Sequence, residues 1–182
     1  MILTKTAQPI EPFLKNVLSS LDLQFQSPTQ QFNNVEAYAT QFGKQLKEQS
    51  AIVVNGKPVV AANSTSRLEF QKQWLMCPLS NHQLGSFDCH IIPGANAIMI
   101  NASGKVRFDE SGRSRLGESA DLINLNPAGA PAYRGRPLWG SFFGFNMNLN
   151  VEQSVINNLD LECINTFNYR LTYKPDDSII QI

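Results

Sequence analysis

The sequence has few of the residues that build metal centres or disulfide frameworks. Only three of its 182 residues are cysteine, and only two are histidine. Cys77, Cys89 and Cys163 lie far apart and form no CxxC pair, which argues against a disulfide framework and against a zinc site. We therefore expect no metal and no cofactor. The three thiols are expected to be reduced and to lie in or near the core.

Net charge and long apolar segments are absent as well. Fifteen basic and fifteen acidic residues give a formal net charge of zero, which argues against a general binder of nucleic acid or of an anionic membrane. No apolar run approaches the roughly 20 residues that cross a bilayer, and the N-terminus lacks a signal-peptide pattern. These absences predict a soluble intracellular protein without membrane contact. Its 42% of hydrophobic residues is enough for one core, so residues 1–182 are expected to form a single domain.

Helical periodicity marks the N-terminal part of the chain. Apolar residues from Ile10 to Leu21 recur at helical spacing, which indicates an amphipathic helix. Pro9 and Pro12 are expected in its first turn, where the missing N–H costs nothing. A second helix is predicted after a cap at position 33 or 34. Its inward-facing residues are predicted to be Val35, Tyr38, Ala39, Phe42 and Leu46.

A hairpin and a third helix follow. Residues 51–62 place Asn55-Gly56 between two apolar runs, and this pair supplies the positive φ angles of a tight hairpin turn. Ser66 and Glu69 have the spacing of a capping box that opens a helix, and Pro78 is expected to end it.

The apolar period changes to two from about residue 83, as is typical of strands. Four long strands are predicted, the second with a bulge at Gly104, and the clearest two cover residues 143–151 and 166–174. Helices followed by adjacent antiparallel strands indicate the α+β class, with a curved antiparallel sheet packed on three helices. Residues at about 110–137 are rich in Gly, Pro, Ser and Asn, which predicts a long flexible loop.

The best catalytic candidate is the pair Asp88 and His90; the neighbouring carboxylates Asp109 and Glu110 are better explained by the turn that follows a strand. Two residues apart on a strand, Asp88 and His90 share a face, so the carboxylate could orient the imidazole as a general base. A small-molecule enzyme or binder with a pocket inside a cone-shaped fold is therefore the alternative function. The pair lies opposite the apolar Phe87 and Cys89 face, which favours a place outside the core. No GxGxxG, P-loop, GxSxG or HExxH motif occurs, so we expect no enzyme.

Basic residues cluster in and before the long loop. They could bind the phosphates of RNA through charge, although Tyr133 is the only aromatic residue in the loop on which a base could stack. A solvated loop of mixed charge is an equal alternative. The candidate RNA contacts are Lys105, Arg107, Arg113, Arg115, Arg134 and Arg136.

The last two strands carry an unusual polar face. Most of its side chains are neutral amides and hydroxyls, whereas a solvated sheet face usually carries more charge. Charged residues are depleted in the cores of protein interfaces, where arginine is favoured. We therefore expect another protein to cover this face, an ordinary wet face rich in Asn being the alternative. The candidate interface residues are Phe142, Asn146, Asn148, Asn150, Asn168, Arg170 and Thr172.

Several segments resemble one known family. They are KVRFDESGR at 105–113, PLWG at 137–140 with Phe143-Gly144 after it, FNY at 167–169 leading to YKPDDS at 173–178, and HIIPG at 90–94. These segments resemble the fungal mRNA transport regulators, the small subunits of the heterodimeric mRNA export receptor. The likeness runs from about residue 66 to the C-terminus, and the N-terminal helices agree in pattern only.

The resemblance implies a nuclear-transport-factor-2-like fold and a non-catalytic role. It implies a heterodimer with the large export receptor subunit, packed sheet to sheet, with Arg170 pairing with an acid of the partner. The pair would carry mRNA, and probably large ribosomal subunits, through nuclear pores, with nucleoporins contacted through the complex. The implied location is the nucleus and the nuclear pore complex, with shuttling to the cytoplasm. The long loop would contact ribosomal cargo.

Overall fold

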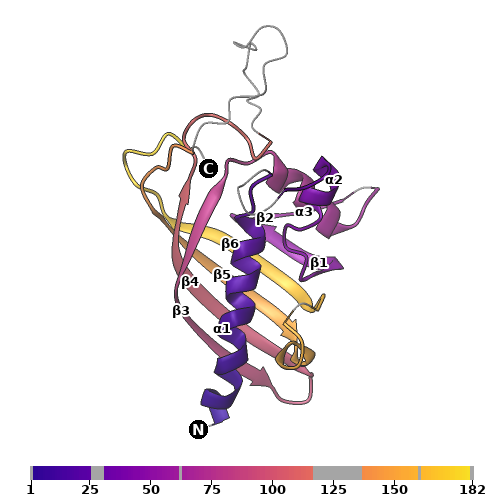
Figure 1. Cartoon of the computed structure of the whole chain (residues 1–182). Helices are drawn as coiled ribbons and strands as arrows, with labels where there is room; N and C mark the ends of the chain where they lie inside the picture. The colour runs from indigo at the N-terminus through magenta and orange to yellow at the C-terminus, as the bar shows by residue number, and fades with distance from the viewer. Residues whose placement is uncertain (1, 26–30, 62, 117–136, 160, 181–182) are drawn as a thin grey trace, which may run out of the picture.

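A mixed sheet and three helices make up the described part of the chain (Figure 1). The computed structural model describes residues 2–25, 31–61, 63–116, 137–159 and 161–180, with side chains from position 9 onward. The helices are α1 (Ile2–Leu21), α2 (Val35–Ala39) and α3 (Ser66–Leu75), with a short 3-10 turn η1 (Gln153–Ile156). The strands are β1 (Leu46–Val54), β2 (Lys57–Pro58), β3 (Ser80–Ile92), β4 (Ala97–Phe108), β5 (Phe143–Glu152) and β6 (Ile164–Tyr173).

The sheet has six strands in the order β2-β1-β6-β5-β4-β3. The four long strands predicted from the alternating pattern are present and antiparallel to one another. The prediction of a wholly antiparallel sheet is wrong, because β1 pairs with β6 in parallel. No hairpin joins these two strands, so their relative direction is set by tertiary packing and not by a local turn.

Helix α1 lies across the sheet and supplies much of the core (Figure 1). Its predicted apolar stripe is buried: Ile10, Phe13 and Leu14 have no exposed surface. The helix begins at Ile2, so the expectation that Pro9 and Pro12 lie in its first turn is wrong; both are inside the helix. That expectation rested on proline's missing N–H, which costs nothing in the first turn of a helix. The helix instead starts well before both prolines.

The second helix is shorter than the pattern suggests. It ends at Ala39, although Phe42 and Leu46 beyond it are still buried as expected. Gly43 has a φ of +57°, a left-handed conformation that ends helices and that glycine adopts at little cost. A Cβ there would also lie 2.9 Å from Leu46 Cδ1, so the backbone turns tightly from the end of the helix into β1.

The third helix and the hairpin agree closely with the sequence pattern. The helix cap is Thr65, whose hydroxyl accepts from the Leu68 N–H at 3.3 Å; the predicted capping Ser66 is instead the first helical residue. Asn55 and Gly56 have φ values of 51° and 78°, as the predicted hairpin turn requires. The two helices α2 and α3 gather with β1 and β2 at one end of the molecule (Figure 1).

A bulge divides β3 into two parts. The register shifts between Leu84 and Ser86, opposite Gly104 of β4. The extra residue is Gly85, so the predicted bulge is present but belongs to the neighbouring strand. A Cβ on Gly104 would approach the Gln83 carbonyl oxygen to 2.0 Å, which is why the two strands can pass this closely only at glycine.

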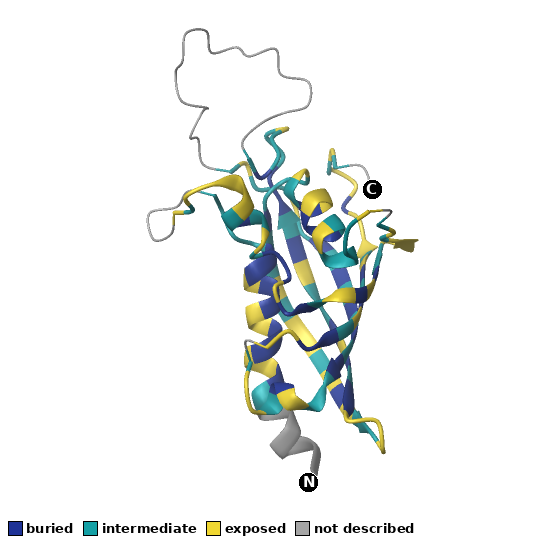
Figure 2. Cartoon of the chain, turned by 90° about the vertical axis from the view of Figure 1, so that its right-hand side faces the viewer, coloured by how far each residue is buried: buried dark blue, intermediate teal, exposed yellow. Residues whose placement is uncertain are grey.

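Buried and exposed residues alternate along the strands (Figure 2). One face of the sheet packs against α1 and α3 and is built from apolar side chains such as Phe145, Met147 and Phe167. The opposite face, here called the outer face, points away from the helices. In the described residues no helix is long and apolar enough to span a membrane.

Candidate functional site

The outer face brings the predicted interface residues together. On β5 the half-buried positions Asn146, Asn148 and Asn150 alternate with fully buried ones. Asn146 lies opposite Arg170 of β6, and Asn148 lies opposite Asn168. The exposed Arg170 therefore stands beside the row of asparagines, near the middle of the sheet.

Two further predicted residues extend this row toward the start of β5. A Cβ on Gly144 would lie 2.7 Å from Thr172 Oγ1, so the Thr172 side chain fills the space that glycine leaves open. Val106 pairs with the buried Phe143, so their neighbours Arg107 and Phe142 point to the outer face. Phe142 is half-buried there.

The amides of the outer face bond to one another in a ladder. The side-chain N–H of Asn146 donates to the Asn101 carbonyl oxygen at 2.9 Å, and Asn148 donates to Asn146 at 3.0 Å. Farther along, Asn165 donates to Asn150 at 3.2 Å. Each amide has two donors and an oxygen with two lone pairs, so these bonds fix the side chains and use only part of their capacity.

The predicted RNA-contact residues do not form one patch in the described structure. Lys105 and Arg107 belong to the outer face, opposite Gly144 and beside Phe142. Arg113 is half-buried in the turn after β4, where its Nε donates to Ser111 Oγ at 3.2 Å. Arg134 and Arg136 lie outside the described residues.

The prediction that Arg115 contacts RNA is wrong, because its side chain is buried in the core. Only 2% of the residue is exposed. Its Nε donates to the Trp74 carbonyl oxygen at 3.0 Å and its Nη2 to Ser80 Oγ at 2.8 Å. The guanidinium carbon lies 4.7 Å from the centroid of the Trp74 ring. Burial is the main cause that lowers the pKa of this guanidinium, and no phosphate can reach it.

Asp88 and His90 are exposed on the outer face, opposite Asn101 and Met99 of β4. The alternative hypothesis of an interior pocket built on these two residues is therefore wrong. A groove of about 650 Å³ opens elsewhere, beside η1 and the turn between β3 and β4, and neither residue lines it. The alternation that puts Cys89 inside puts its neighbours outside.

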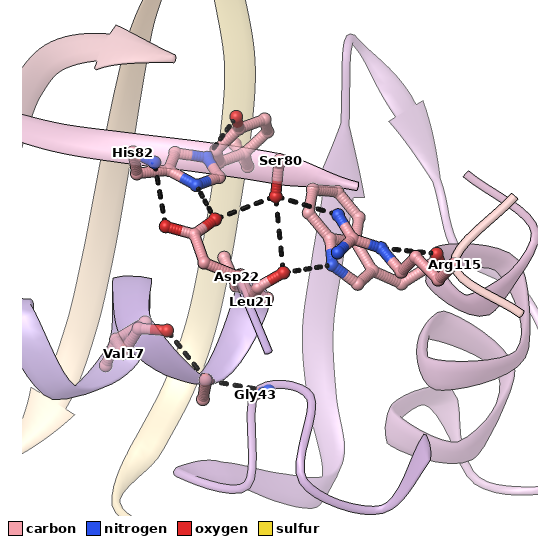
Figure 3. Close-up of polar contacts among 10 residues, drawn as sticks. Val17, Leu21, Asp22, Gly43, Ser80, His82 and Arg115 are labelled. Atoms are coloured by element: carbon pink, nitrogen blue, oxygen red, sulfur yellow. Dashed lines mark hydrogen bonds and ion pairs between the residues drawn. The ribbon is translucent and has the colours of Figure 1, made fainter. Parts of the chain in front are cut away.

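A different Asp–His pair occupies the interior, and the sequence patterns missed it (Figure 3). The Nδ1 of His82 donates to Asp22 Oδ1 at 2.6 Å, and the His82 backbone N–H donates to Oδ2 at 2.7 Å. Its Nε2 lies 2.7 Å from the Tyr169 hydroxyl. Ser80 Oγ donates to Asp22 Oδ1 at 2.7 Å and accepts from Arg115. We call these five residues the interior cluster.

The interior cluster is closed to solvent at its centre. The His82 side chain is fully buried, and 18% of the Asp22 side chain is exposed. Burial, followed by the charge of Asp22, raises the pKa of Tyr169 well above its ordinary value of 10.0, so its hydroxyl keeps its proton and can donate to His82 Nε2. The cluster links the end of α1 to β3, to β6 and, through Arg115, to the stem of the long loop (Figure 3).

The bulge at Gly85 explains why the pattern missed His82. Alternation counted back from Cys89 would put position 82 on the outer face. The extra residue reverses the phase, so His82 pairs with the fully buried Val106 and points inward. The sequence signal that could have placed His82 inside is Gly85, which pairs near Gly104 and allows a bulge on this strand.

The cysteines are free, as the sequence indicates: Cys89 and Cys163 are buried, and Cys77 is partly buried. Burial raises the pKa of the Cys163 thiol to about 12. No group of three or more potential ligands that could hold a metal ion occurs among the described residues.

The fold is that of the nuclear transport factor 2 class. A protein of this superfamily from Salmonella enterica superposes with a TM-score of 0.50 over 98% of each chain at 11% sequence identity, which is a likeness of fold alone. The same class is implied by the three helices packed on one face of a curved, mixed sheet.

Closer relatives define the family. The family model for the nuclear pore RNA shuttling protein Mtr2 matches residues 4–182. The mRNA transport regulator MTR2 of Candida albicans is 52% identical over 177 residues, which cover 96% of this chain and 97% of the relative. The crystal structure of the C. albicans Mtr2-Mex67 M domain complex contains a chain that matches with a TM-score of 0.78 at 50% identity, over 93% of this chain and 98% of that one. The chain belongs to the Mtr2 family of nuclear pore RNA shuttling proteins.

Proposed function

We propose that this chain is the small, non-catalytic subunit of a heterodimeric nuclear export receptor that carries mRNA through nuclear pores. Its membership of the Mtr2 family supports the role, as does a 52% identical relative named as an mRNA transport regulator. The partner would be the large receptor subunit, since the matching C. albicans chain was crystallised with the Mex67 M domain. Residues 1–182 would act as one domain that works at the nuclear pore and shuttles to the cytoplasm.

The outer face is the surface that we assign to the partner. Its central strands carry fixed amides with donors and acceptors still available, and few charges that would have to be desolvated. Such a surface suits the core of a protein interface, where unpaired charges are costly and oriented polar groups confer specificity. Arg170 stands exposed among these amides, in the right place to pair with a carboxylate of the partner.

The interior supports a role without catalysis. The Asp–His pair that could act as a general base, Asp22 with His82, has its bonding groups engaged by neighbours, and the imidazole is fully buried. The pair on the outer face, Asp88 with His90, does not line the groove beside η1. The first pair is therefore closed to a substrate, and the second lies on an open surface.

Cargo contacts form the remaining part of the proposal. Large ribosomal subunits and RNA would be contacted by the arginines at the turn and in the long loop, Arg113, Arg134 and Arg136, with nucleoporins reached through the complex. Arg113 supports this part of the proposal by its position in the turn between β4 and the long loop, where it is half-buried.

The test is a charge reversal at the centre of the proposed interface. Arg170→Glu should weaken binding to the large subunit's domain, the counterpart of the Mex67 M domain, by about 2–5 kcal/mol, because the pair is lost and an unpaired acid is buried. Isothermal titration measures the affinity, and urea unfolding confirms that the isolated chain still folds.

Lys72→Glu is the matched control. Lys72 is exposed on α3, on the opposite side of the sheet, so the same change of charge there should leave the affinity within about 0.5 kcal/mol of the unmodified chain. Equal binding by the Arg170→Glu and Lys72→Glu variants would show that the outer face is not the surface that binds the partner.

A further inference from the structure

Three side chains form a charged platform at one end of the outer face. The Arg107 guanidinium carbon lies 5.1 Å from the centroid of the Trp139 ring and 5.3 Å from that of Phe142. Arg107 comes from β4, whereas the two rings come from the far side of the long loop. Trp139 is held in place by a backbone bridge to Asp109, so the loop ends where the platform begins.

The platform continues the proposed interface. Lys105 pairs with Gly144, and Val106 pairs with Phe143. Arg107 and Phe142 therefore lie on the same face of the sheet as Gly144 and Asn146. The row of outer-face amides therefore leads without interruption to the two aromatic rings. Any partner that covers Asn146 and Arg170 would extend onto this platform if its footprint reached the ends of β4 and β5.

Nearby acids do not neutralise Arg107. Asp109 Oδ1 accepts from the backbone N–H groups of Ser111 and Leu138, and its Oδ2 accepts from Ser111 Oγ. Glu110 Oε1 accepts from Ser178 Oγ. Within the described part of the chain no carboxylate forms an ion pair with Arg107, and its Nε has no hydrogen-bond partner.

Both signs of charge border the platform: Asp177 Oδ2 accepts from Ser141 Oγ at 2.8 Å and Glu110 packs against Gly140, whereas the neighbouring strands carry cations. Lys105, Arg107 and Arg170 flank the start of β5 on its two neighbouring strands. Two acids on the strands of the same face lie away from the platform: Asp88 is on the outermost strand β3, opposite Asn101, and Glu152 is at the far end of β5, paired with Lys47. The charged strand residues at this end of the outer face are therefore cations, which suits a partner surface that carries carboxylates.

We propose that Arg107 is a second arginine contact of the heterodimer, which receives a carboxylate of the large receptor subunit while Trp139 and Phe142 hold its guanidinium. This inference rests on the proposed function and adds a specific partner group to it. Contact with aromatic rings restricts the arginine before binding, so less side-chain entropy is lost. Its Nε is buried, so the two terminal nitrogens, Nη1 and Nη2, are the groups that can donate parallel bonds to a carboxylate.

RNA phosphate is the competing ligand for the same guanidinium. The surroundings favour protein, because Lys105, Arg107 and Arg170 are followed along β5 by neutral amides, so the cations do not continue along the face as a phosphate backbone would need. Both rings are also occupied by the arginine, which leaves less of their surface for a base to stack on.

The experiment compares three variants in binding to the large subunit's domain and, as the assembled heterodimer, to a single-stranded RNA. Arg107→Ala should weaken heterodimer affinity by about 30-fold or more. Arg107→Lys keeps the charge but loses the fork and should weaken it by about tenfold. Lys105→Ala removes a neighbouring cation without aromatic contacts and should change affinity by less than about threefold.

The outcomes separate this inference from the proposed function. If the unmodified chain fails to bind the large subunit, both the proposed function and this inference are overturned. Binding that is lost in Arg170→Glu but unchanged in Arg107→Ala overturns the inference alone. A folded Arg107→Ala variant that forms the heterodimer normally and has a weakened affinity for RNA also overturns it, and assigns the platform to phosphate.

Discussion

Two polar regions of this molecule use similar side chains in opposite ways. In the interior cluster, Asp22 accepts three hydrogen bonds and both ring nitrogens of His82 are engaged. On the outer face the asparagines bond to each other but retain free donors and acceptors. A closed network of buried groups can only stabilise the fold, since each lost partner leaves an unsatisfied group. An open network on a surface can recognise another protein.

The same contrast separates two pairs of identical residue types. Asp22 and His82 meet across 60 positions of the chain in the interior, whereas Asp88 and His90 are neighbours on one strand and are exposed. Proximity in sequence identified the second pair as a catalytic candidate, and tertiary packing assembled the first. The surroundings of an Asp–His pair, and not its spacing in the sequence, therefore decide what the pair can do.

The largest effect on stability is expected from the interior carboxylate. Asp22→Ala should lower the free energy of unfolding by about 3 kcal/mol, because the His82 backbone N–H, the His82 ring and Ser80 lose their acceptor. Urea unfolding followed by circular dichroism measures the change. Asp88→Ala is the matched control and should stay within about 0.5 kcal/mol of the unmodified chain. Equal losses of unfolding free energy in the two variants would show that the interior cluster stabilises the fold no more than the outer face does.

A smaller effect is expected from the hydroxyl of Tyr169. Tyr169→Phe should cost about 1 kcal/mol, because a hydrogen bond to His82 Nε2 is removed while the ring stays packed. Tyr173 is 60% exposed, so Tyr173→Phe should leave the unfolding midpoint in urea unchanged. If the Tyr173 variant were the less stable of the two, the hydrogen bond assigned to Tyr169 would contribute nothing.

Alkaline pH provides an independent check on the same hydroxyl. Burial raises the pKa of Tyr169 well above 10.0 and that of Tyr38 to about 12, so both groups release their protons more readily in the unfolded chain. Their contribution to stability is complete below pH 10 and is lost as pH rises toward the folded pKa values. Tyr169→Phe should therefore make stability fall less steeply above about pH 10. A slope identical to that of the unmodified chain would contradict the assignment.

The smallest effect on stability is expected from the loop arginines. Changing Arg113, Arg134 and Arg136 together to Ala should leave unfolding nearly unchanged and reduce the salt slope of RNA binding by about 2, because fewer counterions are released. Filter binding over a range of salt concentrations measures this slope. Arg115→Ala should do the reverse: the buried guanidinium contributes to stability, and its loss should leave the slope as it was. An unchanged salt slope in the triple variant would show that these arginines do not contact RNA.

Much of the fold could be predicted from the sequence. Alternation along residues 143–151 and 166–174 gave the two central strands, and Asn55-Gly56 gave the hairpin turn, because each depends on local geometry. The boundaries were less secure where one residue decides the conformation. The second helix ended at Ala39, earlier than its apolar pattern indicated, and Pro9 did not mark the start of the first.

The candidate site divides in the same way. The outer-face residues on β5 and β6 could be placed together from the period of two, since side chains two apart on a strand share a face. Arg115 could not be placed, because it belongs to a loop by sequence and to the core by packing. The contact between Arg107, Trp139 and Phe142 also needed the structure, because the long loop separates the arginine from both rings.

The sequence by itself determined the α+β class, the amphipathic first helix, the alternation of the long strands and the amide-rich face, along with the segments that carry the family resemblance. These features depend on periodicity and turn chemistry within a few residues of chain. Tertiary structure alone decided the parallel pairing of β1 with β6, the inward turn of His82 behind the bulge and the burial of Arg115. Each of these joins groups far apart in the sequence, where packing and desolvation outweigh local preference.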